Sequence, residues 1–358
     1  MMNRLQALVQ KLPQEADGVL ITSSVNRDYL TGLKTSSGVL LVTRGECYLL
    51  VDFRYIEVAR NTVRDCEVIL QDKLEEQLKE LVKKHDIHTL ALEVGYQTIG
   101  ELNRFQKYLP KVEFLTDNRV NDVIKELRSI KDEREIAAIR AAQKVTDTAF
   151  LGILDFIEPG RTEREIAAEL EYRMKLDGAE NPAFDTICVA GPNSSLPHGV
   201  PGDRPIQAGD FLTMDFGAMV DHYCSDMTRT VAVGHVTEEM QKIYQLVLDA
   251  QLAAIAKIAS GVPCKEVDAA ARDMIYGAGY EGCFGHGLGH SLGLEIHEDP
   301  RFSHLVKSDI LCRPGLVMSV EPGVYLPGRF GCRIEDIILV TEDGCQVLTQ
   351  SPKELIVL

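Results

Sequence analysis

The sequence predicts an α+β protein of two domains, a smaller α/β domain over residues 1–125 and a larger α+β domain over residues 126–358. The 358 residues exceed the usual size of one domain. The first third alternates short apolar runs with helical patterns, as α/β domains do. The remainder contains an internal repeat, which predicts two similar halves packed together.

The smaller domain begins with an amphipathic pattern within residues 1–18, which predicts a short helix. A second helical pattern follows further on, at 75–85. Short apolar runs bounded by Gly, Ser or Asp predict strands, because strands are short and turns are rich in these residues. These runs cover 18–23, 38–43, 47–52 and 89–94, the second and third being joined by a turn at 44–46.

The larger domain opens with two predicted helices. The first covers 132–157, with Asp132 as its N-cap and a Pro-Gly pair beyond its end. In the second, Thr162 and Glu165 have the spacing of a capping box, and Gly178 marks the stop.

The internal repeat relates residues 159–180 to residues 260–281 at an offset of 101. Further on, the segment around Asp215 resembles the segment around Glu321 at an offset of 106. The alternative is chance similarity between helices rich in small residues. Duplication is favoured because the second match aligns two acids that belong to the candidate site.

Composition excludes several classes of partner. The net charge of −16 argues against nucleic acid or an anionic membrane as a partner. No apolar run reaches the ~18–20 residues of a membrane span. The N-terminus lacks the apolar region and cleavage site of a secretory signal.

The nine cysteines are odd in number, scattered and without a CxxC pair. This pattern predicts reduced thiols in a cytoplasmic protein rather than a disulfide framework. Cys188 lies in an apolar run and is expected in the core rather than as a nucleophile.

Four acids and one histidine carry the strongest functional signal. Each lies in a short apolar or glycine-rich segment, where an unpaired charge is costly. Four acids cannot neutralise one another, so the set predicts a cation site. Oxygen ligands with a single nitrogen suit Mn²⁺, Co²⁺ or Zn²⁺, and bridging acids would allow two ions roughly 3.5–4 Å apart. The five residues are Asp215, Asp226, His290, Glu321 and Glu335.

The first two acids lie in a predicted hairpin, one on each arm, where cross-strand neighbours converge on one face. Asp221, at the predicted turn, is expected in solvent. The alternative is that Asp215 and Asp226 are turn acids or form a salt bridge to Arg229.

Residues 285–299 contain three histidines among four glycines. The spacing of His286 and His290 lacks the glutamate of the HExxH zinc motif, and glycine disfavours a helix. A strand and loop are therefore expected, with one metal ligand and nearby proton donors, among them His297.

Two apolar segments, 319–325 and 333–340, are each expected to place a glutamate in a strand. In the second, Arg333 and Glu335 would share one face and Asp336 would point the other way. His198 lies in a proline-rich loop, 194–202, and alone is no stronger a candidate for function than for structure.

In this order, five segments resemble the Xaa-Pro aminopeptidase and dipeptidase (prolidase) branch of the pita-bread metallopeptidases. They are FDTICVAGPNSSLPHG, MDFGAMVDHYCSDMTRT, GHGLGHSLGLEIHE, VEPGVY and RIED, across residues 184–336. DYLTGL and VDFRY also fit the extra N-terminal domain of this branch. The resemblance implies a pita-bread domain with internal pseudo-twofold symmetry behind that N-terminal domain.

The resemblance also implies the role of each site residue. It assigns Asp215 to one ion and His290 with Glu321 to the other, while Asp226 and Glu335 bridge them. Glu321 matches the position that handles the proton of the nucleophile. Substrate binding and stabilisation of the tetrahedral intermediate are implied for His198 and His297, a supporting role for Arg333, and a site-adjacent position for His286.

The implied function is a dinuclear metallopeptidase that cleaves the bond between an N-terminal residue and proline, as an Xaa-Pro aminopeptidase. Mn²⁺ is the expected metal, with Co²⁺ and Zn²⁺ as alternatives. The implied substrates are peptides with proline at the second position, and the family suggests a homodimer. One alternative is an Xaa-Pro dipeptidase restricted to dipeptides. Methionine aminopeptidase is disfavoured because that branch usually lacks the N-terminal domain.

Two further alternatives are a non-catalytic binding protein on the same fold and a metal-free hydrolase of the creatinase type. Loss of a metal ligand would mark both of them. Every ligand position is intact in this sequence, which disfavours both.

Overall fold

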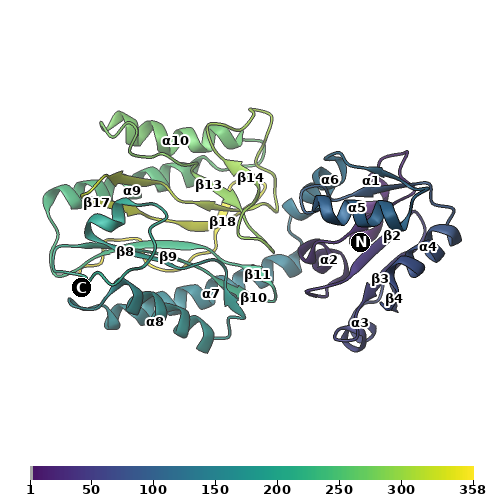
Figure 1. Cartoon of the computed structure of the whole chain (residues 1–358). Helices are drawn as coiled ribbons and strands as arrows, with labels where there is room; N and C mark the ends of the chain where they lie inside the picture. The colour runs from purple at the N-terminus through teal and green to yellow at the C-terminus, as the bar shows by residue number, and fades with distance from the viewer. Residues whose placement is uncertain (1–2) are drawn as a thin grey trace. The chain divides into compact units, whose positions relative to one another are not determined.

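The computed structural model describes residues 3–358 and separates into two compact units, one ending at Arg128 and the other spanning Ser129–Leu358. The boundary expected between residues 125 and 126 lies inside the helix at which the first unit ends. Among the described residues, the first unit forms a six-stranded mixed sheet in the order β4-β3-β2-β1-β5-β6 (Figure 1). Its elements are α1 (Arg4–Lys11), β1 (Gly18–Ile21), α2 (Ser24–Thr31), β2 (Val39–Thr43), β3 (Cys47–Val51), α3 (Ile56–Thr62), β4 (Glu67–Leu70), α4 (Leu74–Lys84), β5 (Thr89–Leu92), α5 (Ile99–Tyr108), β6 (Glu113–Leu115) and α6 (Arg119–Ser129).

The strands and helices predicted for this unit are confirmed. Most of their predicted ends lie within one or two residues of the observed ends. Of the helix predicted within residues 1–18, Arg4–Lys11 is helical, and residues 1–2 lie outside the described part. The core forms because Leu78 of α4 and Phe105 of α5 pack against strand residues such as Leu41 and Leu90.

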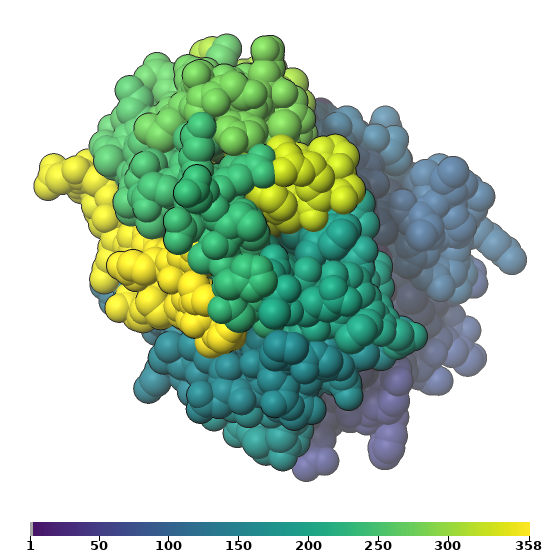
Figure 2. Space-filling view, turned by 90° about the vertical axis from the view of Figure 1, so that its left-hand side faces the viewer, coloured from purple at the N-terminus to yellow at the C-terminus, as the bar shows by residue number. Residues whose placement is uncertain are grey.

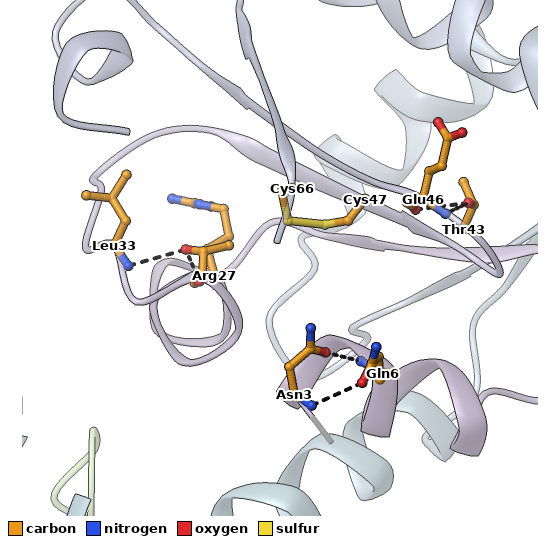
Figure 3. The surroundings of a disulfide bond; sticks show 9 residues. Asn3, Gln6, Arg27, Leu33, Thr43, Glu46, Cys47 and Cys66 are labelled. Atoms are coloured by element: carbon orange, nitrogen blue, oxygen red, sulfur yellow. Dashed lines mark hydrogen bonds between the residues drawn. A yellow bond between two sulfur atoms is a disulfide. The ribbon is translucent and has the colours of Figure 1, made fainter. Parts of the chain in front are cut away.

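Capping boxes explain where several helices begin. Asn3 and Gln6 exchange side-chain and backbone hydrogen bonds at the start of α1 (Figure 3). The two caps predicted in the larger domain, at Asp132 and Thr162, are confirmed by the same reciprocal pattern.

The prediction that all cysteines are reduced is wrong for Cys47 and Cys66, which form a disulfide with a Cα–Cα distance of 4.6 Å (Figure 3). The two residues are 19 apart in the sequence and meet because β3 and β4 are parallel neighbours joined by α3. A spacing pattern alone does not reveal such a meeting. The cysteines therefore give no support to a reducing compartment. Cys188 is a buried free thiol, as predicted.

The second unit consists of two similar halves, which confirms the predicted duplication. In the first half, two helices accompany a sheet in the order β12-β9-β8; in the second, two helices accompany the order β14-β13-β15-β18-β19. Helices α8 and α10 are both 14 residues long and start at the offset of 101. Figure 1 shows α7 and α8 along one side of the strands and α9 and α10 along the other.

The elements of the first half, with a short hairpin extension, are α7 (Glu133–Ile153), η1 (Leu154–Phe156), α8 (Glu163–Leu176), β7 (Asn181–Pro182), β8 (Ile187–Ala190), η2 (Gly191–Ser195), β9 (Phe211–Phe216), β10 (Ala218–Val220), β11 (Tyr223–Cys224) and β12 (Met227–Ala232). Those of the second are α9 (Glu238–Lys257), α10 (Cys264–Gly277), β13 (Gly289–Ser291), β14 (Glu298–Phe302), β15 (Val317–Val320), β16 (Gly323–Leu326), β17 (Phe330–Arg333), β18 (Asp336–Val340) and β19 (Cys345–Val347).

The segment after β19 connects the two halves. Ala232 of β12 exchanges backbone hydrogen bonds with Ile356 and Leu358, both at 2.9 Å. Tyr244 of α9 donates its hydroxyl to the Lys353 carbonyl at 2.8 Å. In Figure 2 this segment, in yellow, lies between the blue-teal first half and the green second half. Within residues 3–358, no helix has the length and apolar character required to cross a bilayer.

Candidate metal centre and active site

A cavity of about 560 Å³ in the second unit is lined by all eight residues singled out from the sequence. His286 also lines it, as does Arg301, which the sequence analysis did not consider. The eight are His198, Asp215, Asp226, His290, His297, Glu321, Arg333 and Glu335.

The hairpin of β9 and β12 brings the first two acids to the same face. Asp215 pairs with Thr228 across the antiparallel ladder, and Asp226 lies two residues before Thr228. The turn is where it was predicted, because Asp221 and His222 adopt the left-handed conformation between β10 and β11. Asp221 is exposed, as expected.

The alternative salt bridge from Asp215 or Asp226 to Arg229 is wrong. Arg229 is buried and donates to Asp336 at 2.8 Å. The two hairpin acids are therefore not neutralised by the arginine of their own hairpin.

His290 and Glu321 are held together by the neighbouring strands β13 and β15. The Ser319 hydroxyl accepts from the His290 backbone N–H at 3.0 Å and donates to Glu321 Oε1 at 3.2 Å. Glu321 directly follows β15, and its N–H donates to the Leu288 carbonyl at 2.8 Å. Gly289 is required here because a Cβ would lie 2.0 Å from the Ser319 carbonyl oxygen.

The prediction of one continuous strand over 333–340 is wrong. Arg333 ends β17 and Asp336 begins β18, in different sheets, so Glu335 lies at the crossover between them. The chain switches sheets because the Glu335 N–H donates to the Thr228 carbonyl of β12 at 3.1 Å. Arg333 and Glu335 nevertheless both line the cavity, and Asp336 points away from it, as expected.

Asp226, His290 and Glu335 form the centre of the site, with one potential ligand atom from each within 4.8 Å of the others. His290 Nε2 also lies 3.4 Å from Glu321 Oε1 and 3.6 Å from Asp226 Oδ2. His290 Nδ1 is 3.1 Å from the Ser291 carbonyl, which only accepts, so Nδ1 carries the proton. The Nε2 lone pair therefore faces carboxylate oxygens, an arrangement that a cation between them would stabilise.

The electrostatics of the site reflect an excess of buried acid. Burial, followed by repulsion from Asp215 and Glu321, raises the pKa of Asp226 well above its usual range. Burial and Asp226 do the same to the pKa of Glu335. Burial raises the pKa of Glu321 to about 8. Burial and His297 lower the pKa of His290 to about 3, so its imidazole is neutral, the form that binds metals.

Two buried oxygens, Asp215 Oδ1 and Glu335 Oε1, have no hydrogen-bond partner within residues 3–358. Buried carboxylate oxygens are costly without a partner. Their second oxygens are fixed: Arg333 holds Asp215 Oδ2 at 2.6 Å, and Thr228 donates to Glu335 Oε2 at 2.6 Å. The donor set therefore fits hard or borderline divalent cations.

Arg333 continues into a chain of hydrogen bonds that sequence reasoning missed. It donates to the Tyr325 hydroxyl at 2.8 Å and to the Thr228 hydroxyl at 3.0 Å. Tyr325 in turn lies 2.9 Å from His286 Nε2. Burial, followed by the charge of Arg333, lowers the pKa of His286 to about 4, so that Tyr325 donates to a neutral ring. The β16–β17 hairpin could have indicated this contact, because it pairs Tyr325 with Gly331, two residues before Arg333.

The outer part of the cavity carries the exposed His198 and His297. The His297 ring lies 4.4 Å from the His290 ring, centroid to centroid, in an edge arrangement. Burial, followed by Arg301 and His198, lowers the pKa of His297. Two imidazoles and one guanidinium thus face the space next to the acids.

Known proteins resemble the whole chain. Residues 137–342 match metallopeptidase family M24, and residues 2–130 match the creatinase/prolidase N-terminal domain. An Xaa-Pro dipeptidase of Pyrococcus furiosus is 38% identical over 358 residues, covering 99% of this chain and 100% of the relative.

Two solved structures superpose closely. An Xaa-Pro dipeptidase from Bacillus anthracis has a TM-score of 0.94 at 38% identity, covering 99% of both chains. An X-Pro aminopeptidase from Thermotoga maritima MSB8 has a TM-score of 0.90 at 36% identity, covering 96% of this chain and 98% of the other.

Proposed function

Because the chain belongs to metallopeptidase family M24, we propose that it hydrolyses the bond before proline in Xaa-Pro dipeptides. Relatives named Xaa-Pro dipeptidase support this choice over the aminopeptidase that the sequence analysis placed first. The aminopeptidase remains the second candidate, supported by the similar X-Pro aminopeptidase structure.

The observation that carries the proposal is the buried acid cluster facing a neutral His290 lone pair. In the proposal, Asp215, Asp226, His290, Glu321 and Glu335 hold two divalent cations, Mn²⁺ first and Co²⁺ or Zn²⁺ as alternatives. When bound, such ions polarise the scissile carbonyl and lower the pKa of water.

The protein's own groups would then divide the remaining work. Arg333 holds Asp215 Oδ2, so Oδ1 is left to face the cation. Glu321 accepts the proton released by the attacking water. His198 and His297, at the outer cavity, donate hydrogen bonds to the substrate carbonyl oxygen as it gains negative charge.

The substrate preference follows from the cavity wall and from proline. An Xaa-Pro bond has no N–H, so an enzyme cannot hold it through that donor. An apolar wall suits the pyrrolidine ring, and Phe184, Ile187, Ile296 and Val306 provide one. Arg301 would pair with the free carboxylate of a dipeptide, because guanidinium and carboxylate geometries match.

The test removes the metal, restores Mn²⁺ and compares an Xaa-Pro dipeptide with an Xaa-Pro-Xaa tripeptide. We expect faster cleavage of the dipeptide, and loss of that preference in Arg301→Gln. Release of only the first residue from the tripeptide would favour the aminopeptidase. No cleavage of either substrate with any of the three metals would overturn the peptidase proposal, and the non-catalytic binding protein would then replace it.

We also propose a cytoplasmic homodimer. Light scattering of the purified protein tests the dimer, because a monomer mass contradicts it. Trapping thiols with an alkylating agent in intact cells tests the compartment: alkylated Cys47 and Cys66 would support the cytoplasm, and an intact disulfide would contradict it.

A further inference from the structure

A carboxylate on helix α8 is buried beneath the loop that carries His198. Glu163, the first residue of α8, is fully buried. Its Oε1 accepts from the Ala190 N–H at 2.8 Å and from the Asn193 amide at 3.0 Å. Its Oε2 accepts from the Gly202 N–H at 3.0 Å.

These bonds close the loop at its two ends. Residues 191–202, named here the His198 loop, leave β8 after Ala190, and their only regular structure is a 3₁₀ turn. Ala190 directly precedes the loop and Gly202 is its last residue, and one carboxylate binds the N–H of both. On its other side, the loop contacts β17 through Ser194, whose hydroxyl accepts from the Gly331 N–H at 2.9 Å.

The negative charge of Glu163 gives it a hold on the loop that a neutral side chain of the same shape would lack. Within residues 3–358, the structure shows no ion pair to Glu163, so three N–H donors of the loop region stabilise its buried charge. Hydrogen bonds to an ionised acceptor are stronger than neutral ones. Burying a carboxylate without a counter-ion is costly, and the N–H donors offset that cost only when the loop is in place.

In the second half of the duplicated unit a buried acid also contacts a histidine loop, but this acid is ion-paired to Arg272 at 2.7 Å. Asp268 of α10, the counterpart of α8, is fully buried, and its Oδ1 accepts from the Leu288 N–H at 3.0 Å. That bond fixes the segment containing His286. Each second helix thus carries a buried acid beneath a loop that faces the cavity, but the two acids are not at equivalent positions, because the offset of 101 aligns Glu163 with Cys264.

We propose that Glu163 is a positioning residue that holds His198 in place for the substrate, a role that rests on the proposed function. Glu163 does not line the cavity, so it acts through the His198 loop rather than on the substrate. Its loss should therefore change substrate turnover and leave metal binding intact. A misplaced substrate group can reduce kcat/KM by about 100-fold.

The test compares Glu163→Gln with a matched control on the same helix, Glu165→Gln. Glu165 also accepts a backbone hydrogen bond, from the Thr162 N–H at 2.7 Å, but makes none with the His198 loop. In Mn²⁺-loaded protein, we expect faster amide hydrogen exchange in residues 190–202 for Glu163→Gln and wild-type exchange there for Glu165→Gln. We also expect kcat/KM to fall about 10- to 100-fold in the first variant, with unchanged metal content.

Asn193→Ala keeps the charge and deletes one donor, so it gives a milder loosening if Glu163→Gln fails to fold. Wild-type exchange in the His198 loop in Glu163→Gln, or in Asn193→Ala if the first does not fold, overturns the inference. Loss of metal in either variant also overturns it. Absence of Xaa-Pro hydrolysis in the wild type would overturn the proposed function alone, because the exchange comparison does not depend on the substrate.

Discussion

Glu335 and Asp336 are adjacent in the sequence and both are buried, but their surroundings are opposite. Asp336 Oδ1 accepts from Arg229 at 2.8 Å, and Oδ2 forms an ion pair with Lys353 at 2.5 Å. Glu335 faces Asp226 and Glu321, and one of its oxygens has no partner within residues 3–358. The crossover from β17 to β18 sends the two side chains in opposite directions.

The difference separates an acid paired with cations of the chain from an acid surrounded by other acids. The Asp336 cluster carries its own cations, so it is complete when the chain folds. Around Glu335, by contrast, the acids outnumber the one paired cation, Arg333, which is what the proposed metal ions would offset. Burial alone does not distinguish the two acids; the sign of the neighbouring charges does.

The largest expected effect is on activity. Glu335→Ala should reduce kcat/KM by at least about 10³-fold, because losing a ligand weakens a centre that stabilises the transition state by several kcal/mol. The thermal midpoint of the metal-free variant should equal or exceed that of the metal-free wild type, since one repelled acid is gone. Scanning calorimetry with a chelator checks this, and a lower midpoint would mean that Glu335 is structural.

The matched change next to it should have the opposite effect. Asp336→Asn should lower the free energy of unfolding by about 3–5 kcal/mol, because it leaves two cations without their buried partner. Metal content of the folded fraction should stay at the wild-type level. Urea unfolding measures the stability, and metal analysis measures the metal content. Loss of metal with normal stability would contradict the proposed difference between Asp336 and Glu335.

The metal-free protein should lose stability as pH rises from about 4.5 to 8. The pKa of Glu321 is raised to about 8 in the folded protein, so folding favours its protonated form. That contribution is fully present below the pKa of the unfolded carboxyl and disappears as pH approaches 8.

Bound Mn²⁺ offsets the same charge, so the gap between metal-loaded and metal-free thermal midpoints should widen over this range. Both the metal-loaded and the metal-free protein must be measured at each pH. Groups outside the site titrate equally in the two forms and cancel in the difference between the midpoints. A difference between the two thermal midpoints that stays constant from pH 5 to 8 would contradict the raised pKa of Glu321.

The smallest effect is expected at Lys353. Lys353→Ala should lower the free energy of unfolding by about 1 kcal/mol, because its side chain is partly exposed and Arg229 still holds Asp336. A loss as large as that of Asp336→Asn would show that the two cations are not independent. The same urea titration measures both variants.

Much of the fold was accessible from the sequence because its signals are local. Capping patterns at Asp132 and Thr162 predicted helix starts, and the offset of 106 predicted that Asp215 and Glu321 hold equivalent places. The residues that line the cavity were recognisable because the sequence keeps acids within apolar segments. Their assignment to individual ions remains a prediction.

The features that were missed depend on contacts distant in sequence. Cys47 meets Cys66 through strand pairing, and Tyr325 reaches Arg333 through a hairpin. Glu163 carries no local signal beyond its place at a helix start, although it lies beneath a loop that returns 27 to 39 residues later. The break between Arg333 and Asp336 was hidden because apolar residues continue across it.

The duplication divides the candidate ligands between the two halves. Asp215 and Asp226 come from the first, and His290, Glu321 and Glu335 from the second. A nascent chain with only its first half emerged from the ribosome therefore carries two acids and no imidazole ligand. On the proposed ligand assignment, the metal centre therefore forms only after the second half has been synthesised and has packed against the first.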